Sequence, residues 1–280
     1  MWLRDSSAQV VHYLPYLKEY PILKEMVKGL IARQAKYVHI DPYANAFNEE
    51  DNGNCWEKDL TKYNPWNWER KYEIDSLCYP IWLIKQYVEN SGARDVFTPE
   101  VKQAFRDILD VWQTEQYHEN SEYSFVRLNC PPSDTLSNDG KGAPVGYTGM
   151  TWSGFRPSDD ACKYGYLIPS NMFASVVLDY MAEHYDAVII ESFGVGGLPN
   201  YEGASYHKAV EKWISQGKIV VMTTQVTNEG SNMSVYEVGR TIKYEFGLLE
   251  SYDMTLEATV TKLMWILGQT HDRAKVKEMF

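Results

Sequence analysis

The stretch "PILKEMVKGLIARQAKYVHI" (residues 21–40) carries the clearest structural signal in this chain of 280 residues. Its apolar residues recur at spacings of three and four, which is typical of one side of a helix. They are Ile22, Leu23, Met26, Val27, Leu30 and Ile31. The pattern predicts a helix with one buried face.

Three more segments before residue 185 have helical patterns. Residues 72–90 repeat the apolar spacing, although Pro80 is expected to kink this helix or to end one segment of it. Residues 98–116 begin with threonine, proline and glutamate, which favours a capped helix start, and place Phe105, Ile108, Leu109 and Trp112 inward. Residues 170–184 predict the last helix. Long polar and aromatic segments (41–70 and 121–150) separate them, and such segments usually carry function. We expect a helical barrel with its site at one rim.

The pattern changes near residue 183. Residues 1–182 hold seven of the nine tryptophans and eleven of the twelve prolines, whereas the remainder alternates between strand and helix. A short apolar strand at 187–190, covered on both faces, a helix within 203–217 and a strand from 219 predict a βαβ unit. A closing helix in 252–269 should be capped by Asp253 and place Leu256, Val260, Leu263 and Leu267 inward. We therefore expect two domains, 1–182 and 183–280.

The turn "GVGG" (194–197) lies between the predicted strand and helix. Glycines at this place can let backbone amides approach a phosphate. The spacing is not GxGxxG, however, and Pro199 stands where a phosphate-binding helix should begin. A tight turn is the favoured interpretation, with nucleotide binding as the alternative.

The composition excludes several classes of partner. A net charge of −11 argues against nucleic acid, and no segment reaches the roughly 20 apolar residues of a membrane helix. The four cysteines and six histidines show no metal-binding spacing, so we expect no metal and no cofactor. Without a recognisable secretory signal at the start, a cytoplasmic location with reduced thiols is expected.

An acidic pair, Asp159 and Asp160, lies within "TWSGFRPSDDACKYGYLIPSNMF" (151–173), between aromatic residues. Glycoside hydrolysis needs two carboxyl groups on opposite sides of the scissile bond. Neighbouring residues point in different directions, so one aspartate is expected to face a cleft and the other to cap or support a following helix. Aromatic walls beside polar groups suit sugars. A helical scaffold with polar loops and an acidic surface is the alternative.

Several motifs, in the same order, closely resemble glycoside hydrolase family 125, the metal-independent exo-α-1,6-mannosidases. They are "MWLRDSSAQVVHYLP", "IDPYANAFNEE", "WERKYEIDSLCYPIWL" and the long segment from "DTLSNDGKG" to "NMFASVVL", and together they cover about residues 1–181. The resemblance implies an (α/α)6 barrel, of which this chain would hold an incomplete part, and inversion of the anomeric centre. It assigns the general acid to Asp159.

The same resemblance suggests residues that bind a terminal mannose: Arg4, Asp5, Asn45, Glu69, Arg70, Glu73 and Arg156. About half of these could instead form a buried network that supports the site. Trp66 and Trp68 are either a stacking platform for sugar or part of the core. The expected ligand is an α-mannoside oligosaccharide.

Residues 184–280 resemble the C-terminal domain of cytoplasmic-type L-asparaginases, in "YDAVIIESFGVGGLP", "GKIVVMTTQVTNEGSNMSVYEVG" and "YDMTLEATVTKLMWILGQ". In that family the nucleophilic threonine belongs to the other domain, and this domain contributes dimer contacts. We therefore expect possible self-association here and nominate no nucleophile.

The two resemblances suggest a chimeric or truncated chain built from parts of two enzymes. The mannosidase general base belongs to the last third of the barrel, which the sequence lacks, so turnover is predicted to be severely impaired. An asparaginase-type amidohydrolase module and a non-catalytic mannose-binding fragment are the alternatives.

Overall fold

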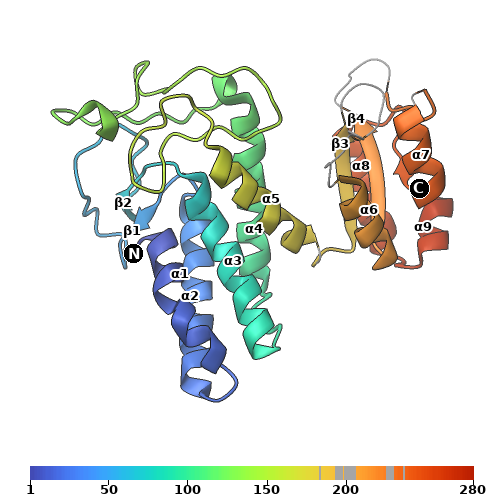
Figure 1. The fold of residues 1–280 in the computed structure, drawn as a ribbon, viewed down its shortest axis with the longest axis horizontal. Coiled ribbons are helices and arrows are strands. Elements are labelled where there is room, and N and C mark those ends of the chain that lie inside the picture. Colours follow the sequence, from blue (N-terminus) through green and yellow to red (C-terminus); the bar gives the residue numbers. More distant parts are fainter. Residues whose placement is uncertain (183, 193–197, 199–205, 225–229, 236) are drawn as a thin grey trace. The chain divides into compact units, whose positions relative to one another are not determined.

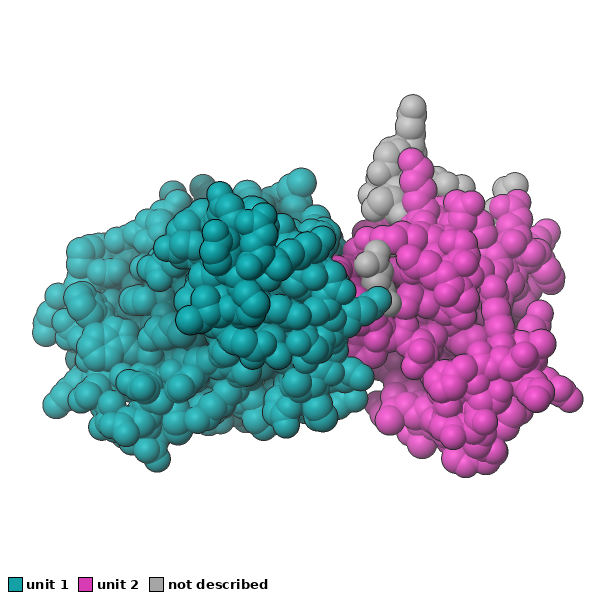
Figure 2. All heavy atoms as spheres, turned by 90° about the horizontal axis from the view of Figure 1, so that it is seen from below, with its two compact units in different colours: residues 1–178 teal, residues 179–280 magenta. Residues whose placement is uncertain are grey.

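The computed structural model describes residues 1–182, 184–192, 198, 206–224, 230–235 and 237–280. The chain divides into two compact units, Met1–Leu178 and Asp179–Phe280 (Figure 2). The first unit is helical with one small sheet, and the second combines helices with a parallel sheet (Figure 1). No helix among the described residues has both the length and the apolar character needed to cross a membrane.

The first unit is a set of helices below long loops (Figure 1). Helix α2 packs against α3 and α4, and α1 packs against α3. Strands β1 and β2 pair antiparallel in the loop region. The elements are α1 (Leu3–Val10), η1 (Val11–Tyr16), α2 (Pro21–Ile40), β1 (Ala46–Phe47), β2 (Asn67–Glu69), α3 (Ile74–Ser91), α4 (Pro99–Thr114), η2 (Glu115–Asn120), η3 (Pro132–Asp134) and α5 (Ile168–Ala182).

Helix α2 has the predicted bounds, but its buried face differs from the expected one. Ile22 is 80% exposed and Met26 is 46% exposed, so the first turns of the helix leave apolar residues in solvent. Burial begins at Val27 and Ile31 and continues through the second half of the helix. The spacing alone gave the angular position of the stripe but not the part of its length that other helices cover.

Helix α3 continues through Pro80 instead of ending or splitting there. Proline costs a helix about 3 kcal/mol through its missing hydrogen bond and its ring. Leu77 and Ile81, on either side of it, are both at most 1% exposed, and each buried side chain of this size contributes roughly 1.5–3 kcal/mol. Packing therefore outweighs the local penalty.

Helix α4 begins as predicted, because the Thr98 hydroxyl accepts a hydrogen bond from the Val101 amide at 3.3 Å. Phe105, Ile108 and Trp112 are buried as expected, but Leu109 is 38% exposed. Leu109 lies at the margin of the apolar stripe, which the neighbouring helices do not reach.

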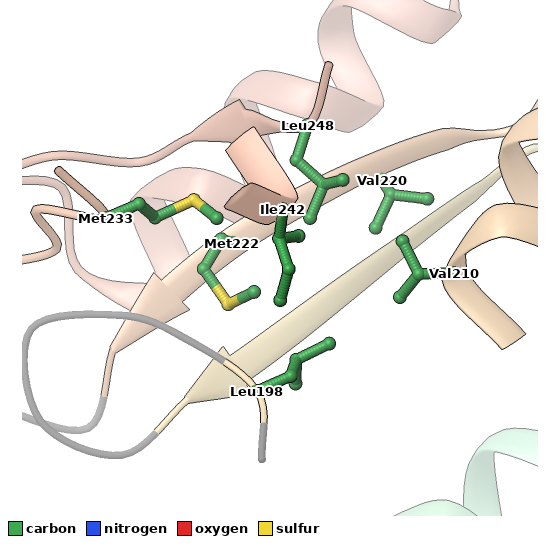
Figure 3. Packing of buried hydrophobic residues seen from close by; sticks show 7 residues of the cluster. All are labelled: Leu198, Val210, Val220, Met222, Met233, Ile242 and Leu248. Atoms are coloured by element: carbon green, nitrogen blue, oxygen red, sulfur yellow. The ribbon is translucent and has the colours of Figure 1, made fainter. Parts of the chain in front are cut away.

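The second unit is built around a parallel sheet in the order β3–β4–β5. Because successive residues of a strand face opposite sides, β4 contributes to two separate cores. Val220 and Met222 belong to one, which Figure 3 shows, and Ile219 and Val221 belong to the other. The elements are β3 (Ala187–Ser192), α6 (Tyr206–Ser215), β4 (Ile219–Thr224), α7 (Glu237–Phe246), β5 (Leu249–Glu250), α8 (Leu256–Leu267) and α9 (Arg273–Met279).

Three details of the second unit differ from the sequence-based expectations or lie outside what is described. Strand β3 is half-buried over 187–191, because it lies at the edge of the sheet, and β4 is the covered central strand. Helix α8 is capped by Thr255, whose hydroxyl accepts from the Ala258 amide, and not by Asp253. Leu263 is buried as predicted, together with Ile266. The "GVGG" turn at 194–197 lies outside the described residues.

Candidate active site

Asp159 lies in a tight hairpin turn. Phe155 and Ala161 form an antiparallel bridge, the Asp159 amide donates to the Arg156 carbonyl at 2.8 Å, and the Arg156 amide donates to the Asp160 carbonyl at 2.8 Å. This pattern is that of a type I turn followed by a residue in the left-handed conformation. Proline at position 157 is favoured as the second residue of such a turn. Asp159 occupies the left-handed position with φ +63°.

The turn sends the two neighbouring aspartates to different partners. One carboxyl oxygen of Asp159 lies 3.6 Å from Arg4 Nη2. The Asp160 carboxylate instead accepts hydrogen bonds from Arg156 Nη2 at 2.7 Å and from the Ser158 hydroxyl at 2.9 Å. The predicted divergence of the pair is confirmed. The predicted helix directly after Asp160 is wrong, because the next helix, α5, begins only at Ile168.

Arg4 is the centre of a cluster of carboxyl groups. Its Nη1 donates to Glu73 Oε2 at 2.9 Å and lies 3.5 Å from Asp75 Oδ2. Asp5, half exposed on the same helix, lies 3.7 Å from Arg4 Nε. The cluster brings together the start of α1, the start of α3 and the 156–160 turn, three segments that are far apart in the sequence.

Two acids of the cluster, Glu73 and Asp75, have raised pKa values. Burial raises the pKa of Glu73 well above its ordinary value, the charge of Asp75 raises it further, and Arg4 acts in the opposite direction. Burial also raises the pKa of Asp75, against the lowering effect of Arg4. Burial on its own would lower the pKa of Arg4, but the carboxylates around it, Glu73 foremost, raise it. Arg4 therefore stays positively charged, while burial disfavours the ionised forms of Glu73 and Asp75 beside it.

Three carboxyl oxygens of this cluster are buried and have no hydrogen-bond partner among the described residues. They are Glu73 Oε1, Asp75 Oδ1 and Asp159 Oδ1, of which Asp159 Oδ1 lies 3.6 Å from Arg4 Nη2. Buried polar atoms are normally hydrogen-bonded. Unpartnered carboxyl oxygens beside a guanidinium group are suited to bind the hydroxyl groups of a small polar ligand.

Asn45 and Glu69 belong to a second, closed network beside this cluster. Glu69 accepts from Asn45 Nδ2 at 3.1 Å and, on its other oxygen, from Arg127 Nη2 at 2.8 Å. Arg127 also binds both oxygens of Asp59, at 2.7 and 2.8 Å. In this structure the side chains of Asn45 and Glu69 bind protein partners.

Arg70 likewise contacts protein groups. Its Nε donates to Asp41 Oδ2 at 2.7 Å, and its guanidinium lies over the rings of Tyr43 and Tyr123. Arg156 is half-exposed and paired with Asp160. Of the seven residues that the sequence suggested for mannose contacts, Asp5 and Glu73 lie with Asp159 around another of the seven, the cation Arg4.

Trp66 and Trp68 are the pair for which the sequence suggested either a stacking platform for sugar or a place in the core. Trp66 lies against Tyr37 and beneath the ammonium group of Lys36, which is 4.1 Å from the ring centre. Trp68 contacts the exposed Trp56, with ring centres 6.4 Å apart. Both tryptophans are half-buried, and each lies against another aromatic ring of the protein.

Sequence reasoning missed three charged residues of the site: Asp75, Arg127 and Lys71. Asp75 lies two residues after Glu73, at the first turn of α3, and the spacing in "YEID" could have placed both acids near the start of one helix. Lys71 is a buried cation whose Nζ donates to the Asp159 carbonyl oxygen. Arg127 lies in a loop without periodic pattern, and no local signal indicated its role.

Comparisons with known proteins show similarity to alpha-mannosidases. The sequence matches the family described as metal-independent alpha-mannosidase (GH125) over residues 1–243. A Streptococcus pneumoniae metal-independent alpha mannosidase, solved in a non-productive substrate complex with alpha-1,6-mannobiose, has 51% sequence identity and a TM-score of 0.64, covering 66% of this chain and 43% of its own. The Meiotically up-regulated gene 157 protein of Schizosaccharomyces pombe is 31% identical over 205 residues, 66% of this chain and 40% of its own.

The C-terminal part of the chain is similar to a different protein. L-asparaginase from Thermococcus kodakarensis is 41% identical over 103 residues, which cover 37% of this chain and 30% of the asparaginase. The GH125 match extends to residue 243, beyond the 1–181 expected from the motifs, and leaves 37 residues after it. The two similarities overlap, because the asparaginase match is 103 residues long and 37 residues follow residue 243.

The match over most of its length shows that the chain belongs to the metal-independent alpha-mannosidase family GH125, a family of glycoside hydrolases. It also carries a C-terminal segment with similarity to L-asparaginase. The chain spans less than half of the length of the mannosidase and of the fission-yeast relative.

Proposed function

We propose that this chain is a glycoside hydrolase directed at terminal α-mannosides, with Asp159 as its general acid. The observation that carries the proposal is the convergence of Asp159 and Glu73 on Arg4, each with a buried carboxyl oxygen that has no hydrogen-bond partner among the described residues. A sugar offers several hydroxyl donors and acceptors in a small volume. Carboxyl oxygens and a guanidinium are suited to bind them.

In this proposal each residue has a distinct role. Asp159 delivers a proton to the glycosidic oxygen as the bond to the leaving group breaks. Arg4 and Glu73 hold the hydroxyls of the terminal ring, and Asp5 lies at the exposed margin of the same cluster. Asn45, Glu69, Arg70 and Arg156 bind sugar only if their present protein partners exchange for it.

We also propose that the two parts of the chain have different roles. Residues 1–182 supply part of an (α/α)6 barrel and the sugar site, and residues 183–280 form a module like the C-terminal domain of L-asparaginase. The mannosidase similarity covers 66% of the chain, and the asparaginase similarity covers 37%. Inversion requires a second carboxylate that activates water on the opposite face of the ring, and the resemblance puts it in the last third of the barrel. The proposal therefore includes slow turnover by this chain.

The test is release of mannose from α-1,6-mannobiose by the full chain and by two variants. Asp159→Asn removes the proton donor and should reduce release by at least about 100-fold, the contribution typical of general acid catalysis. Asp160→Asn is the matched control, because Asp160 pairs with the half-exposed Arg156, and should leave release within a few-fold.

The outcomes separate the candidate functions. Equal release by the wild type and Asp159→Asn overturns the acid assignment. Binding of mannobiose in calorimetry without release by any form supports a sugar-binding site without catalysis. Absence of both binding and release contradicts the proposal as a whole.

Self-association through the second unit is the remaining proposal. Met264 and Trp265, neighbours on α8, are 67% and 63% exposed, and large exposed apolar side chains favour association. Sedimentation of the full chain should show a dimer or larger species that dissociates in Met264→Ser/Trp265→Ser. A monomer at all concentrations contradicts this.

A further inference from the structure

The left-handed backbone of Asp159 needs support from its surroundings. Side chains other than glycine rarely adopt positive φ, and asparagine and aspartate do so more readily than most. The position that Asp159 occupies in a turn of this kind usually holds glycine. Residues kept in such a conformation at a functional site are held there by contacts from the surrounding structure.

Lys71 supplies such a contact. Its Nζ donates to the Asp159 carbonyl oxygen at 2.9 Å and to Asp134 Oδ1 at 3.1 Å, and lies 3.8 Å from Glu69 Oε1. The side chain is only 2% exposed. A buried ammonium group requires partners that satisfy its donors and its charge, and here a main-chain oxygen of the turn is one of them.

The position of Lys71 is itself fixed from both ends. Its backbone amide donates to Asn45 Oδ1 at 3.1 Å. Its ammonium group lies 5.1 Å from the ring centre of Phe155, the residue at which the hairpin begins. Lys71 therefore links the buried Asn45–Glu69 network to the turn that carries the proposed acid.

We propose that Lys71 is a positioning residue that holds the Asp159 turn in its left-handed form and thereby directs the carboxyl group towards Arg4. It acts through the backbone of Asp159 and needs no contact with the sugar. The effect on sugar binding rests on the proposed function, whereas the effect on the turn does not.

The test compares Lys71→Met with the wild type, as full chains. The variant keeps the length of the side chain and removes the three donors. Crystal structures, and the amide-to-α-proton coupling of Asp159 in solution, should show that residue 159 leaves the left-handed region. Affinity for α-1,6-mannobiose should fall on the order of 10- to 100-fold, the size of effect expected when a binding or reacting group is misplaced by about 1 Å.

Two further variants sharpen the test. Lys141→Met is the matched control, because Lys141 Nζ also donates to two main-chain oxygens, those of Ser121 and Tyr123, and should leave the turn and the affinity unchanged. In Lys71→Met/Asp159→Gly the turn should stay left-handed, because glycine adopts positive φ without help.

The result that overturns the proposal is an unchanged Asp159 backbone in Lys71→Met, whatever happens to sugar binding. If Lys71→Met does not fold, Asp134→Ala removes the half-exposed carboxylate that orients Lys71 and should loosen the turn in the same direction. If the wild type does not bind mannobiose, the proposed function is contradicted. The conformation of the turn in Lys71→Met still decides the role of Lys71 in that case.

Discussion

Replacing Arg4 by methionine should lower the stability of the first unit, because it removes the cation that balances the buried acids beside it. Arg4 is 16% exposed in its side chain, and Glu73 and Asp75 are 0% and 5% exposed in theirs. Removing one partner of a buried ion pair costs about 3–5 kcal/mol, because it leaves an uncompensated charge. Since the Arg4 side chain keeps some contact with solvent, we expect a loss of about 3 kcal/mol at pH 8.

The same loss should shrink as the pH falls. Burial raises the pKa of Glu73 and of Asp75 in the folded protein, and Arg4 opposes both shifts. The folded state therefore retains protons that the unfolded state has released, so stability falls as the pH rises above the unfolded values near 4. Without Arg4 the folded pKa values rise further, and the fall with pH becomes steeper. The loss should therefore be smaller at pH 5 than at pH 8, because a lower pH favours the protonated form of both acids in the fold.

The assay is urea unfolding followed by tryptophan fluorescence at pH 5 and pH 8. Seven of the nine tryptophans belong to residues 1–182, so the signal reports mainly on the first unit. Arg4→Met/Glu73→Gln is the control, because it removes the acid together with its cation and should be more stable than Arg4→Met at pH 8. An equal loss at both pH values, or none at pH 8, refutes the account of this cluster.

Three further predictions concern packing and capping. Gly165→Ala should cost about 2–3 kcal/mol of unfolding free energy, because φ of Gly165 is +75° and the added Cβ would lie 2.6 Å from Val145 Cγ1. Gly146→Ala, whose added Cβ would have nothing within 4 Å, should be nearly neutral. Equal effects of the two substitutions in urea unfolding contradict this. Ile266→Ala should cost about 2–5 kcal/mol because Ile266 is 0% exposed. Val235→Ala, at a site 53% exposed, should change stability by less than about 0.5 kcal/mol; thermal unfolding of the two variants decides. Thr98→Ala should cost about 1 kcal/mol through the lost cap of α4, and an unchanged melting temperature would show that the cap contributes nothing.

The fold was predictable where the sequence carried a periodic signal. The 3.6-residue spacing located α2, and threonine followed by proline located the start of α4, because both are determined by local geometry. The exposure of Ile22 and the continuation of α3 through Pro80 could not be read in this way. They depend on which neighbouring helices reach each turn, and that is a property of the tertiary structure.

The site was predictable in part for a similar reason. The divergence of Asp159 and Asp160 follows from their adjacency, and Arg4 and Glu73 lay in motifs whose residue types suit a sugar. Lys71 lies in the same motif as Glu73, but its ammonium group donates to the main-chain oxygen of Asp159, 88 residues later. A long-range contact of this kind leaves no periodic mark in one sequence.

The most direct measurement is a crystal structure of Asp159→Asn soaked with α-1,6-mannobiose at saturating concentration. The account predicts one mannose ring in contact with Arg4 and with Glu73 Oε1, and residue 159 beside the glycosidic oxygen. A disaccharide bound elsewhere, or a ring whose glycosidic oxygen lies out of reach of residue 159, contradicts it.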